Sequence, residues 1–564
     1  MPLAAFPQPA YTPAGGAGKP AWDRPRGVGV PAEEHPLTLA LKHAALKYPP
    51  SDLIGGEWLP LNRTSEHHVA SHNPARPEQI VWSGHASLEH VDAAVAAARG
   101  AFPGWAAWGR DNRFRVLKRF AELCKQRAPQ VAELICDETG KVMWEAKGEA
   151  MALASKVDIT LDASPIGGLN RVQGFEFEMG PQKYGRTWFK PHGVMAVLGP
   201  FNFPAHLPNG HIIPALAMGN TVVFKPSDKT PGVGQILTEL LQDALMLEGA
   251  PHKGAGVVNL VQGGAETAAA LSGHADLDGI LFTGSWPVGR KIMQANLDRP
   301  GRILALEMGG NNAAVVMHDA DLRQAAIEVV RCAFNTTGQR CTCTRRLVVH
   351  TLVADKLIPA IVKAAEGLVI DSPRAAKAGG VFMGPIISEA ARETVLSAQK
   401  SWSKKSSGGE VVLEAKAIDR PDKGWYISPG ILKVPKFVAT ETKDAGSDTE
   451  VFGPLLRISI ARDLGEAIEQ ANATRFGLAA SIFTSDLKAA ERFMFESRAG
   501  CVNVNTGTAG ASSKLPFGGL GLSGNHRPAG SFSLDYCAYP VAGMLERGSA
   551  AAIAEGMKWE DRWL

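Results

Sequence analysis

Hydrophobic residues recur at two different spacings along the chain, and each spacing predicts one kind of element. Apolar residues three or four apart between positions 91 and 98 predict a helix with Ser87 as its N-cap. The same spacing between positions 114 and 123 predicts a second helix after Asp111. Both helices should therefore bury one face against a core.

Short apolar runs bounded by glycine or polar residues predict strands. A first series covers 194–199, 221–225, 256–261 and 279–284, and a second covers 313–317, 346–350, 456–461, 480–485 and 501–504. Helical segments lie between the runs. Because strands that alternate with helices indicate parallel sheets, we expect an α/β protein with two Rossmann-like parallel-sheet domains.

The first 50 residues break this pattern. They are rich in proline, glycine and alanine and show no sustained periodicity. Such a composition buries little apolar surface by itself. Only residues 37–48 could form a short amphipathic helix. We expect residues 1–50 to be an arm that is disordered or lies on the folded body.

Composition narrows the class of protein. The chain has 564 residues and a formal net charge of +3, so neither nucleic acid nor an anionic membrane is expected as partner. The N-terminus lacks a signal-peptide pattern, and the apolar runs are shorter than the roughly 18 residues of a membrane span. Seven scattered cysteines form no disulfide framework. We therefore expect a cytoplasmic protein.

Two glycine-containing segments are candidates for binding phosphate. The letters GLGLSG (519–524) match a dinucleotide fingerprint, but loop-forming sequence flanks them where a strand and a helix are required. In LFTGSWPVGRKIM (281–293), an apolar run enters Gly284 and Ser285, and Pro287 fits a first helical turn. Such a helix N-terminus attracts phosphate, although a simple capped turn explains the same letters.

A lysine and an aspartate follow another predicted strand, in FKPSDKTP (224–231). The carboxyl ends of strands in open α/β sheets face the ligand crevice. Lys225 and Asp228 are therefore candidates for holding ribose hydroxyls. An exposed charged turn is the alternative.

Cys341 and Cys343 lie two apart in FNTTGQRCTCTRR (334–346). A zinc site needs three or four ligands, and no second closely spaced Cys/His cluster accompanies this pair, so no metal site is predicted. A disulfide between residues two apart would be strained. From these letters alone, Cys341 is either a reactive thiol or a small buried residue.

Three further segments favour the interpretation of Cys341 as a reactive thiol. Asn202 follows a strand in GPFNFP, Glu307 ends an apolar run in LALEMGGNN, and Glu450 and Phe452 lie in TEVFGPLL. Together with FTGS and GQRC, this ordered set resembles the aldehyde dehydrogenase superfamily. The resemblance extends over residues 51–548.

The resemblance implies a role for each matched residue. Cys341 would attack an aldehyde carbon to give a thiohemiacetal, and Asn202, with a backbone N–H, would stabilise the oxyanion. After hydride transfer to the nicotinamide, Glu307 would act as the base that activates water to hydrolyse the thioester. The implied cofactor contacts are Lys225, Ser227, Asp228, Gly284, Ser285, Gly289, Glu450 and Phe452.

Asp228 departs from the family pattern, because the relatives most like this chain usually have glutamate there. A carboxylate at this position would bind the adenosine ribose and repel a 2′-phosphate. NAD is therefore expected in preference to NADP. Aspartate is one methylene shorter, which would weaken that preference.

Within the superfamily, segments such as GQRCTCTRRLVV and GNHRP resemble the N-succinylglutamate 5-semialdehyde dehydrogenases of arginine breakdown. This implies that the substrate is a small acidic aldehyde. Glutamate 5-semialdehyde or another aldehyde stays open, because Ala529 and Gly530 stand where that branch usually has Ser-Ala. We expect Arg527, with His526, to meet a substrate carboxylate at the mouth of the aldehyde tunnel. Pairing of Arg527 with an acidic neighbour or a partner subunit is the alternative.

The resemblance also implies a domain plan. An NAD-binding domain would cover residues 51–306, interrupted by an oligomerisation hairpin near 172–191, and a catalytic domain would cover 307–524. C-terminal oligomerisation strands would follow at 525–548, and a tail at 549–564. Edge strands of this small β extension invite pairing with another subunit, so a homodimer or a dimer-based oligomer is expected.

Two other functional classes remain to be weighed. A binding protein of this fold without catalysis would be expected to lack the nucleophile, the base or the oxyanion residue. A coenzyme A-dependent, thioacylating enzyme would be expected to lack the base. Cys341, Glu307 and Asn202 are all present, so both classes are disfavoured.

Overall fold

The computed structural model describes residues 45–62, 65–510, 512–549 and 551–564. Most of the predicted arm lies outside these residues, but its last part contacts the folded body. The backbone N–H groups of Lys47 and Tyr48 donate to the Glu239 carboxylate (3.1 and 3.4 Å), and the Tyr48 ring stacks on Trp58. No helix in the described part of the chain is long and apolar enough to cross a membrane.

The first sheet has seven strands. Their spatial order is β11 (Ile303–Glu307), β10 (Gly279–Thr283), β7 (Val194–Leu198), β8 (Thr221–Lys225), β9 (Val258–Leu260), β1 (Ser51–Ile54) and β2 (Glu57–Pro60). The strands from β11 to β9 are parallel, and β1 and β2 join antiparallel at one edge. The carboxyl ends of five neighbouring strands therefore meet at one edge of this sheet.

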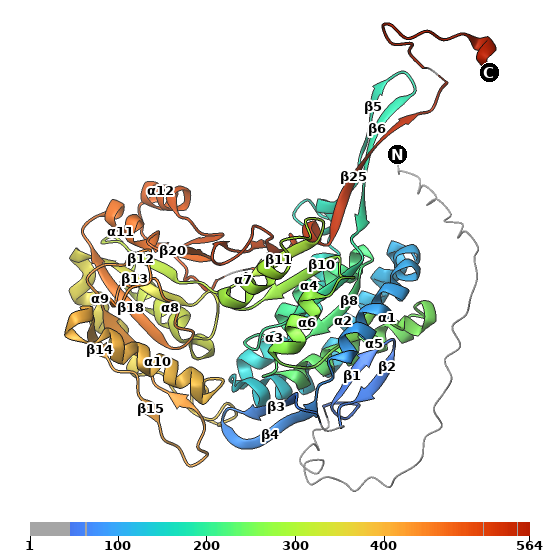
Figure 1. Cartoon of the computed structure of the whole chain (residues 1–564). Helices are drawn as coiled ribbons and strands as arrows, with labels where there is room; N and C mark the ends of the chain where they lie inside the picture. The colour runs from blue at the N-terminus through green and yellow to red at the C-terminus, as the bar shows by residue number, and fades with distance from the viewer. Residues whose placement is uncertain (1–44, 63–64, 511, 550) are drawn as a thin grey trace, which may run out of the picture. The chain divides into compact units, whose positions relative to one another are not determined.

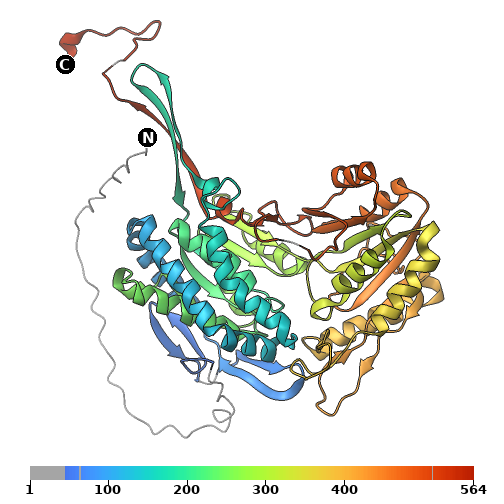
Figure 2. The ribbon, with the colours of Figure 1, turned by 180° about the vertical axis from the view of Figure 1, so that it is seen from behind.

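Helices cover both faces of the first sheet (Figure 1). Alternate strand residues such as Val194 and Ala196 pack against α1 (Glu89–Ala107), α6 (Ala265–Gly273) and α7 (Trp286–Ala295). The intervening residues, such as Met195 and Val197, share a core with α4 (His206–Met218) and α5 (Pro231–Leu247). On that side α2 (Arg110–Thr139) and α3 (Met143–Thr160) add an outer layer, which lies in front when the molecule is seen from behind (Figure 2).

The second sheet is also seven-stranded. Its order is β14 (Glu410–Leu413), β17 (Gly430–Lys433), β18 (Leu455–Ala461), β13 (Thr344–His350), β12 (Asn312–Val316), β20 (Ala479–Phe483) and β21 (Cys501–Val504), and only β14 is antiparallel to its neighbour. One face packs on α8 (Leu322–Phe334) and α9 (Thr351–Glu366). The other face packs on α10 (Glu389–Trp402), α11 (Leu464–Ala471) and α12 (Leu487–Glu496).

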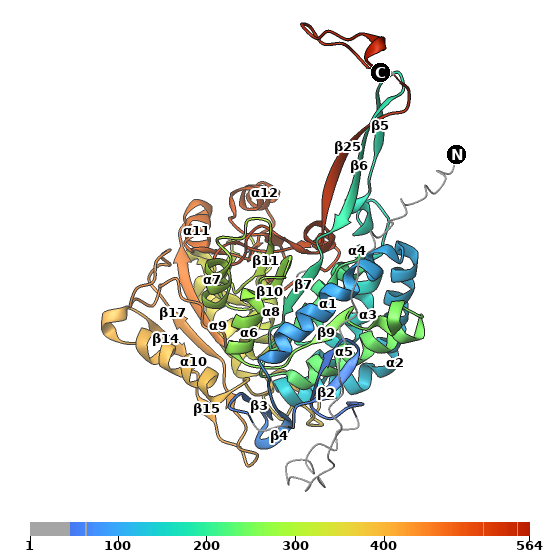
Figure 3. The same ribbon diagram turned by 45° about the vertical axis from the view of Figure 1, so that its right-hand side comes forward.

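A third, antiparallel sheet joins segments that are far apart in sequence. The strand β6 (Lys183–Pro191) lies between β5 (Glu176–Gly180) and β25 (Ala538–Glu546) (Figure 3). A hairpin of β3 (His68–Asn73) and β4 (Arg76–His85) was not predicted. The shortest strands are β15 (Ala417–Ile418), β16 (Tyr426–Ile427), β19 (Phe476–Gly477), β22 (Pro516–Phe517), β23 (Leu520–Gly521) and β24 (Ala529–Gly530).

The α/β class with two parallel-sheet domains is confirmed. The helix-cap prediction at Ser87 is wrong, because α1 begins at Glu89 with Leu88 as N-cap and no side-chain capping bond. Asp111 does not precede its helix either, because α2 begins at Arg110 after Gly109. The first sheet ends at Glu307, and the second begins at Asn312. The chain thus crosses between the two sheets through residues 308–311.

Candidate active site

Cys341 lies in a turn between a short 3-10 segment, η4 (Asn335–Gly338), and the central strand β13. The Asn312 side-chain amide donates to the backbone oxygens of Cys341 (2.7 Å) and Cys343 (2.8 Å), so one residue of β12 holds the turn. Cys341 is partly exposed and lines a cavity, whereas Cys343 is fully buried. Cys341 therefore fits the interpretation as a reactive thiol, and Cys343 fits the interpretation as a small buried residue.

The positive charge of Arg345 favours the Cys341 thiolate, but it is outweighed by burial and nearby carboxylates. Burial, reinforced by the carboxylates of Glu307 and Glu450, raises the pKa of the Cys341 thiol to about 12. Arg340 forms an ion pair with Glu145 (2.6 Å). Arg345 lies 3.7 Å from Glu450. The resting thiol is therefore neutral at pH 7, and forming the thiolate requires a proton acceptor.

Glu307 ends β11 and lines the same cavity as Cys341. Its side chain is 4% exposed, and its Oε2 atom has no hydrogen-bond partner among the described residues. Burial raises the pKa of this carboxyl well above its ordinary value, and a backbone N–H of Gly519 opposes that shift. A carboxyl with one oxygen left free is suited to exchange a proton with water or substrate.

The glycine-rich run 519–524 supports Glu307 and does not bind phosphate through a strand-loop-helix turn. The Ser523 backbone oxygen accepts from Met308 N–H (2.8 Å), and its hydroxyl donates to the Gly309 oxygen (2.6 Å). A side-chain carbon at Gly518 would meet Glu307 Oε1 at 2.8 Å. Glycine is therefore needed where this loop passes the carboxyl.

Asn525 also holds the strand that ends in Glu307. Its side-chain amide pairs with the backbone of β11 through Leu306 N–H (2.9 Å) and the Leu304 oxygen (2.9 Å). The distinctive GNHRP loop is thus bound to the strand that ends in Glu307. His526 and Arg527 are exposed, and neither lines the cavity, although Ala529 and Gly530 do.

Asn202 lies on the loop between β7 and α4. Its side-chain amide donates to the Gln339 oxygen (2.9 Å), two residues before Cys341, and leaves one N–H for another acceptor. Its backbone oxygen accepts from Lys141 Nζ (2.7 Å), which forms a fully buried ion pair with Glu149 (2.6 Å). The Lys141–Glu149 pair that anchors this loop was not predicted from the sequence.

The cavity beside Cys341 has a volume of about 200 Å³. Apolar side chains of Phe203, Leu207 and Phe517 form part of its wall, and Lys156, His206 and His211 contribute polar groups. A cavity of this kind suits a short chain with a few fixed polar contacts. Lys156 was not identified from the sequence.

The predicted cofactor residues from Lys225 to Gly289 lie at the carboxyl edge of the first sheet. Lys225 ends β8 with its Nζ donating to the oxygens of Pro226 (2.8 Å) and Gly263 (2.7 Å), and burial lowers its pKa to about 8. One N–H of this ammonium is left for a ligand. Asp228 follows on the same loop, with Ser227 Oγ 3.3 Å from its carboxylate and Lys229 Nζ 3.7 Å away.

The turn after β10 leads directly into α7. Ser285 is the N-cap of this helix and makes no side-chain capping bond within the described residues. The first turn of α7 therefore presents uncapped N–H groups, as an anion site requires. Gly289 lies where a side-chain carbon would meet Met308 Sδ at 2.3 Å, so its role is close packing.

Glu450 approaches the crossing segment between the two sheets. Its Oε1 accepts from Gly310 N–H (3.0 Å), and a side-chain carbon at Gly309 would collide with Oε2 at 1.9 Å. Phe452 lies edge-on to Phe201 at 6.0 Å between ring centroids. Lys225, the α7 N-terminus and Glu450 thus provide the cation, N–H groups and carboxylate that fit a dinucleotide.

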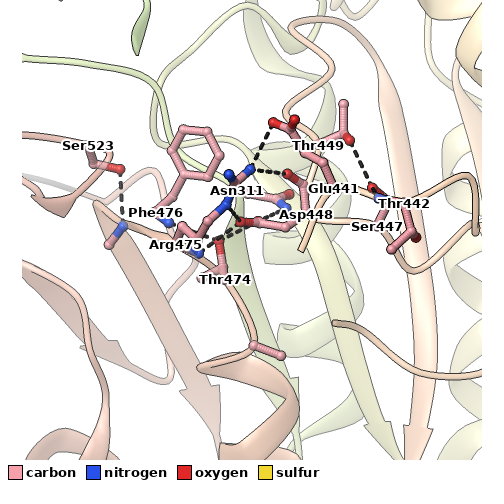
Figure 4. Close-up of polar contacts among 12 residues, drawn as sticks. Asn311, Glu441, Thr442, Ser447, Asp448, Thr449, Thr474, Arg475, Phe476 and Ser523 are labelled. Carbon is pink, nitrogen blue, oxygen red and sulfur yellow. Dashed lines mark hydrogen bonds and ion pairs between the residues drawn. The ribbon is translucent and has the colours of Figure 1, made fainter. Parts of the chain in front are cut away.

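A second carboxylate network fixes the loop that carries Glu450 (Figure 4). Asp448 accepts from Asn311 Nδ2 (2.9 Å), Thr474 Oγ1 (2.6 Å) and the backbone N–H of Arg475 (2.8 Å). Although Asp448 is buried, these bonds lower the pKa of its carboxyl. Because Asn311 belongs to the crossing segment, the Asn311–Asp448 bond ties the Glu450 loop to the segment after Glu307.

Comparisons with known proteins agree with this geometry. The family model described as "Aldehyde dehydrogenase family" matches residues 61–540. An N-succinylglutamate 5-semialdehyde dehydrogenase of Sphingopyxis alaskensis is 44% identical over 87% of this chain and 96% of its own. An NAD-dependent aldehyde dehydrogenase from Sinorhizobium meliloti is 28% identical, with a TM-score of 0.80 over 91% of this chain and 97% of its own. An NADP-dependent enzyme of E. coli is 30% identical, with a TM-score of 0.79 over 89% of this chain and 100% of its own.

Proposed function

This chain belongs to the aldehyde dehydrogenase family, and from that premise we propose that it oxidises N-succinylglutamate 5-semialdehyde to the carboxylic acid with NAD. The name of the Sphingopyxis alaskensis relative supports this substrate. The observation that carries the chemistry is that Cys341 and Glu307 line one cavity, with one Glu307 oxygen left unpaired.

The covalent steps follow from these two side chains. The Cys341 thiol passes its proton to the Glu307 carboxylate, which releases it to water, and the sulfur bonds to the aldehyde carbon while the carbonyl oxygen becomes an oxyanion. The remaining amide N–H of Asn202 stabilises that oxyanion. When bound, NAD would supply the hydride acceptor for this step, and the thiohemiacetal carbon would be left as a thioester on Cys341.

Glu307 then completes the reaction. Its carboxylate takes a proton from water, and the water oxygen bonds to the thioester carbon as the carbon–sulfur bond breaks. The products are the carboxylic acid and the regenerated thiol. Because burial raises the pKa of Glu307, its carboxylate is a stronger base than an exposed one.

Several residues would hold the cofactor. Lys225, with Ser227 and Asp228, would bind the adenosine ribose, and the α7 N-terminus at Gly284 and Ser285 would receive the pyrophosphate. Glu450 and Phe452 would contact the nicotinamide ribose. The Asp228 carboxylate supports NAD over NADP, because it would repel a 2′-phosphate.

We also propose that the sheet of β5, β6 and β25 serves assembly of a homodimer or a dimer-based oligomer. Phe177, Met179 and Met544 on this sheet are 54%, 49% and 65% exposed. Exposed apolar residues on long edge strands favour contact with a second copy.

The test is NADH formation across a panel of aldehydes. Purified enzyme is assayed with N-succinylglutamate 5-semialdehyde, glutamate 5-semialdehyde and propanal, each with NAD and with NADP. The highest kcat/KM is expected for the succinylated substrate with NAD. A preference for propanal would contradict the substrate, and a preference for NADP would contradict the assignment of Asp228.

A further inference from the structure

Lys156 on α3 is a buried cation in the wall of the cavity that contains Cys341. The residue is 2% exposed. Its Nζ donates to the backbone oxygen of Gly530 (2.7 Å) and to Ser533 Oγ (2.7 Å). Both acceptors are neutral, and no carboxylate in the described part of the chain forms an ion pair with Lys156. An ammonium has three donors, so one N–H remains for a ligand.

The other basic side chains of the cavity are already engaged or uncharged. Arg340 pairs with Glu145. His211 has both ring nitrogens within hydrogen-bond distance of Tyr536 OH (2.9 Å) and Thr283 Oγ1 (3.1 Å), and burial lowers its pKa to about 3. Burial also lowers the pKa of His206. Among the described residues that line this cavity, Lys156 is therefore the cation that has no carboxylate partner.

Placing a charge in this position destabilises the protein unless something compensates it. Removing an ammonium from water carries a large desolvation penalty, and two neutral oxygens return only part of it. Burial accordingly lowers the pKa of Lys156 to about 8, which leaves the group mostly charged at pH 7. A ligand anion would supply the missing counter-charge.

We propose that Lys156 binds a carboxylate of the substrate and so sets a preference of this cavity for acidic aldehydes. This inference rests on the proposed function, because the aldehyde end of the same ligand must reach Cys341. The apolar wall residues Phe203, Leu207 and Phe517 would contact the methylene chain between the two ends. A lysine is a compact point charge, which suits a single carboxylate.

The test compares two aldehydes that differ only in a terminal carboxylate, 5-oxopentanoate and pentanal. In Lys156→Met, the KM for 5-oxopentanoate should rise by about tenfold or more, since a charged hydrogen bond is lost. The KM for pentanal should stay within about threefold of wild type. An equal rise for both substrates would overturn the proposal, because it would show that Lys156 only ties α3 to the Gly530 turn.

Two further variants separate the charge from its surroundings. Ser533→Ala removes one neutral partner of Lys156 but keeps the ammonium, so it should retain the preference for 5-oxopentanoate. Arg527→Ala removes an exposed cation that lies close in sequence to Gly530, and this variant should also retain the preference for 5-oxopentanoate. If Arg527→Ala abolishes the preference while Lys156→Met keeps it, the carboxylate is bound at the loop and the proposal fails.

Glutarate binding tests Lys156 without turnover, and so independently of the proposed reaction. Calorimetry on cofactor-free wild type should detect binding that Lys156→Met weakens about tenfold or more. If the enzyme oxidises no semialdehyde yet binds glutarate through Lys156, the proposed function fails, whereas the assignment of Lys156 as the carboxylate-binding group of this cavity holds. Equal affinity in both proteins, or no binding by wild type, would overturn it.

The pH dependence of glutarate binding to wild type gives a readout that needs no variant. Affinity should be constant near pH 7 and fall as pH rises past about 8, where Lys156 loses its proton. The titratable groups that face Lys156 are Cys537, whose pKa burial raises, and His206 and His211, whose pKa values burial lowers. None of these three titrates in that window. Glu307 lines the same cavity and has a raised pKa, so the same pH series in Glu307→Gln separates its ionisation from that of Lys156. Constant affinity from pH 7 to about 9.5 would contradict the proposal.

Discussion

Glu307 and Asp448 are both buried carboxylates, yet their surroundings have opposite effects. Asp448 accepts from Asn311, Thr474 and Arg475, and the pKa of its carboxyl is lowered. Glu307 receives one backbone N–H, keeps an unpaired oxygen, and has a raised pKa. The carboxylate that holds a loop thus has its hydrogen bonds satisfied, whereas the one that we propose as the general base is incompletely bonded among the described residues. The number of hydrogen-bond donors around each carboxylate, more than its burial, accounts for the opposite directions of the two pKa shifts.

The largest effect is expected in the reacting region. Cys341→Ala should lower kcat by about 10⁴-fold or more, because the covalent route is lost. Cys343→Ala is the matched control: it should keep most of the turnover and cost about 1 kcal/mol of stability, since Cys343 is only packed. Steady-state NADH formation and thermal unfolding measure both, and equal loss of activity in the two variants would contradict the assignment.

Glu307→Gln tests whether the incompletely bonded carboxyl does chemistry. The variant should lower steady-state turnover by about 10²- to 10⁴-fold, as expected when a general base is removed. Rapid-mixing measurement should still show a first-turnover burst of NADH if Glu307 acts mainly in thioester hydrolysis. An unchanged steady-state rate would rule out this role.

Asp448→Asn should affect stability more than turnover, which is the reverse of the result expected for Glu307→Gln. It should lower the free energy of unfolding by about 2 kcal/mol, because an amide cannot accept from all the donors around this position. Denaturant unfolding at pH 7 measures this loss, with Glu307→Gln as the comparison. A fully stable Asp448→Asn protein would remove the contrast between the two carboxylates.

The two variants should also differ in the sign of their pH dependence. The lowered pKa of Asp448 stabilises the fold at pH values above its unfolded pKa, and that contribution is lost as pH falls through the folded pKa. The raised pKa of Glu307 favours the fold at low pH, and that contribution is lost as pH rises through the folded pKa. Melting temperatures from pH 2 to 9 should show Glu307→Gln gaining on wild type as pH rises, and Asp448→Asn gaining on wild type only as pH falls below about 4. The same trend in both variants would contradict the opposite shifts.

The smallest effect is expected from deleting residues 1–44, which precede the described part of the chain. Among the described residues, the hydrogen bonds to the carboxylates of Glu307 and Asp448 come from residues after position 310. Turnover should stay within about twofold of the full-length protein. A truncated protein that melts normally but has lost activity would show that this segment contributes to the site.

Local patterns were enough to predict both parallel sheets, because each strand is a short apolar run with its own boundaries. The order of motifs likewise indicated Cys341, Glu307 and Asn202. The partners of these residues could not be predicted in this way. Asn311 meets Asp448 across 137 residues, and Lys156 meets Gly530 across 374. Such polar pairs form only when the two sheets and the C-terminal turn come together, and they leave no periodic signal in the sequence.

The crossing segment 308–311 has a mechanical consequence. Glu307 closes one sheet, Asn312 opens the other, and the four residues between them form one of the covalent connections between the two sheets. If the two domains tilt against each other as a ligand enters or leaves, points near the pivot travel least. We expect the general base to keep its distance from the thiol through such a motion, while groups far from the link, such as Lys225 or the α7 N-terminus, sweep through a wider arc. The enzyme would then open to exchange ligands without dismantling the pair that does the chemistry.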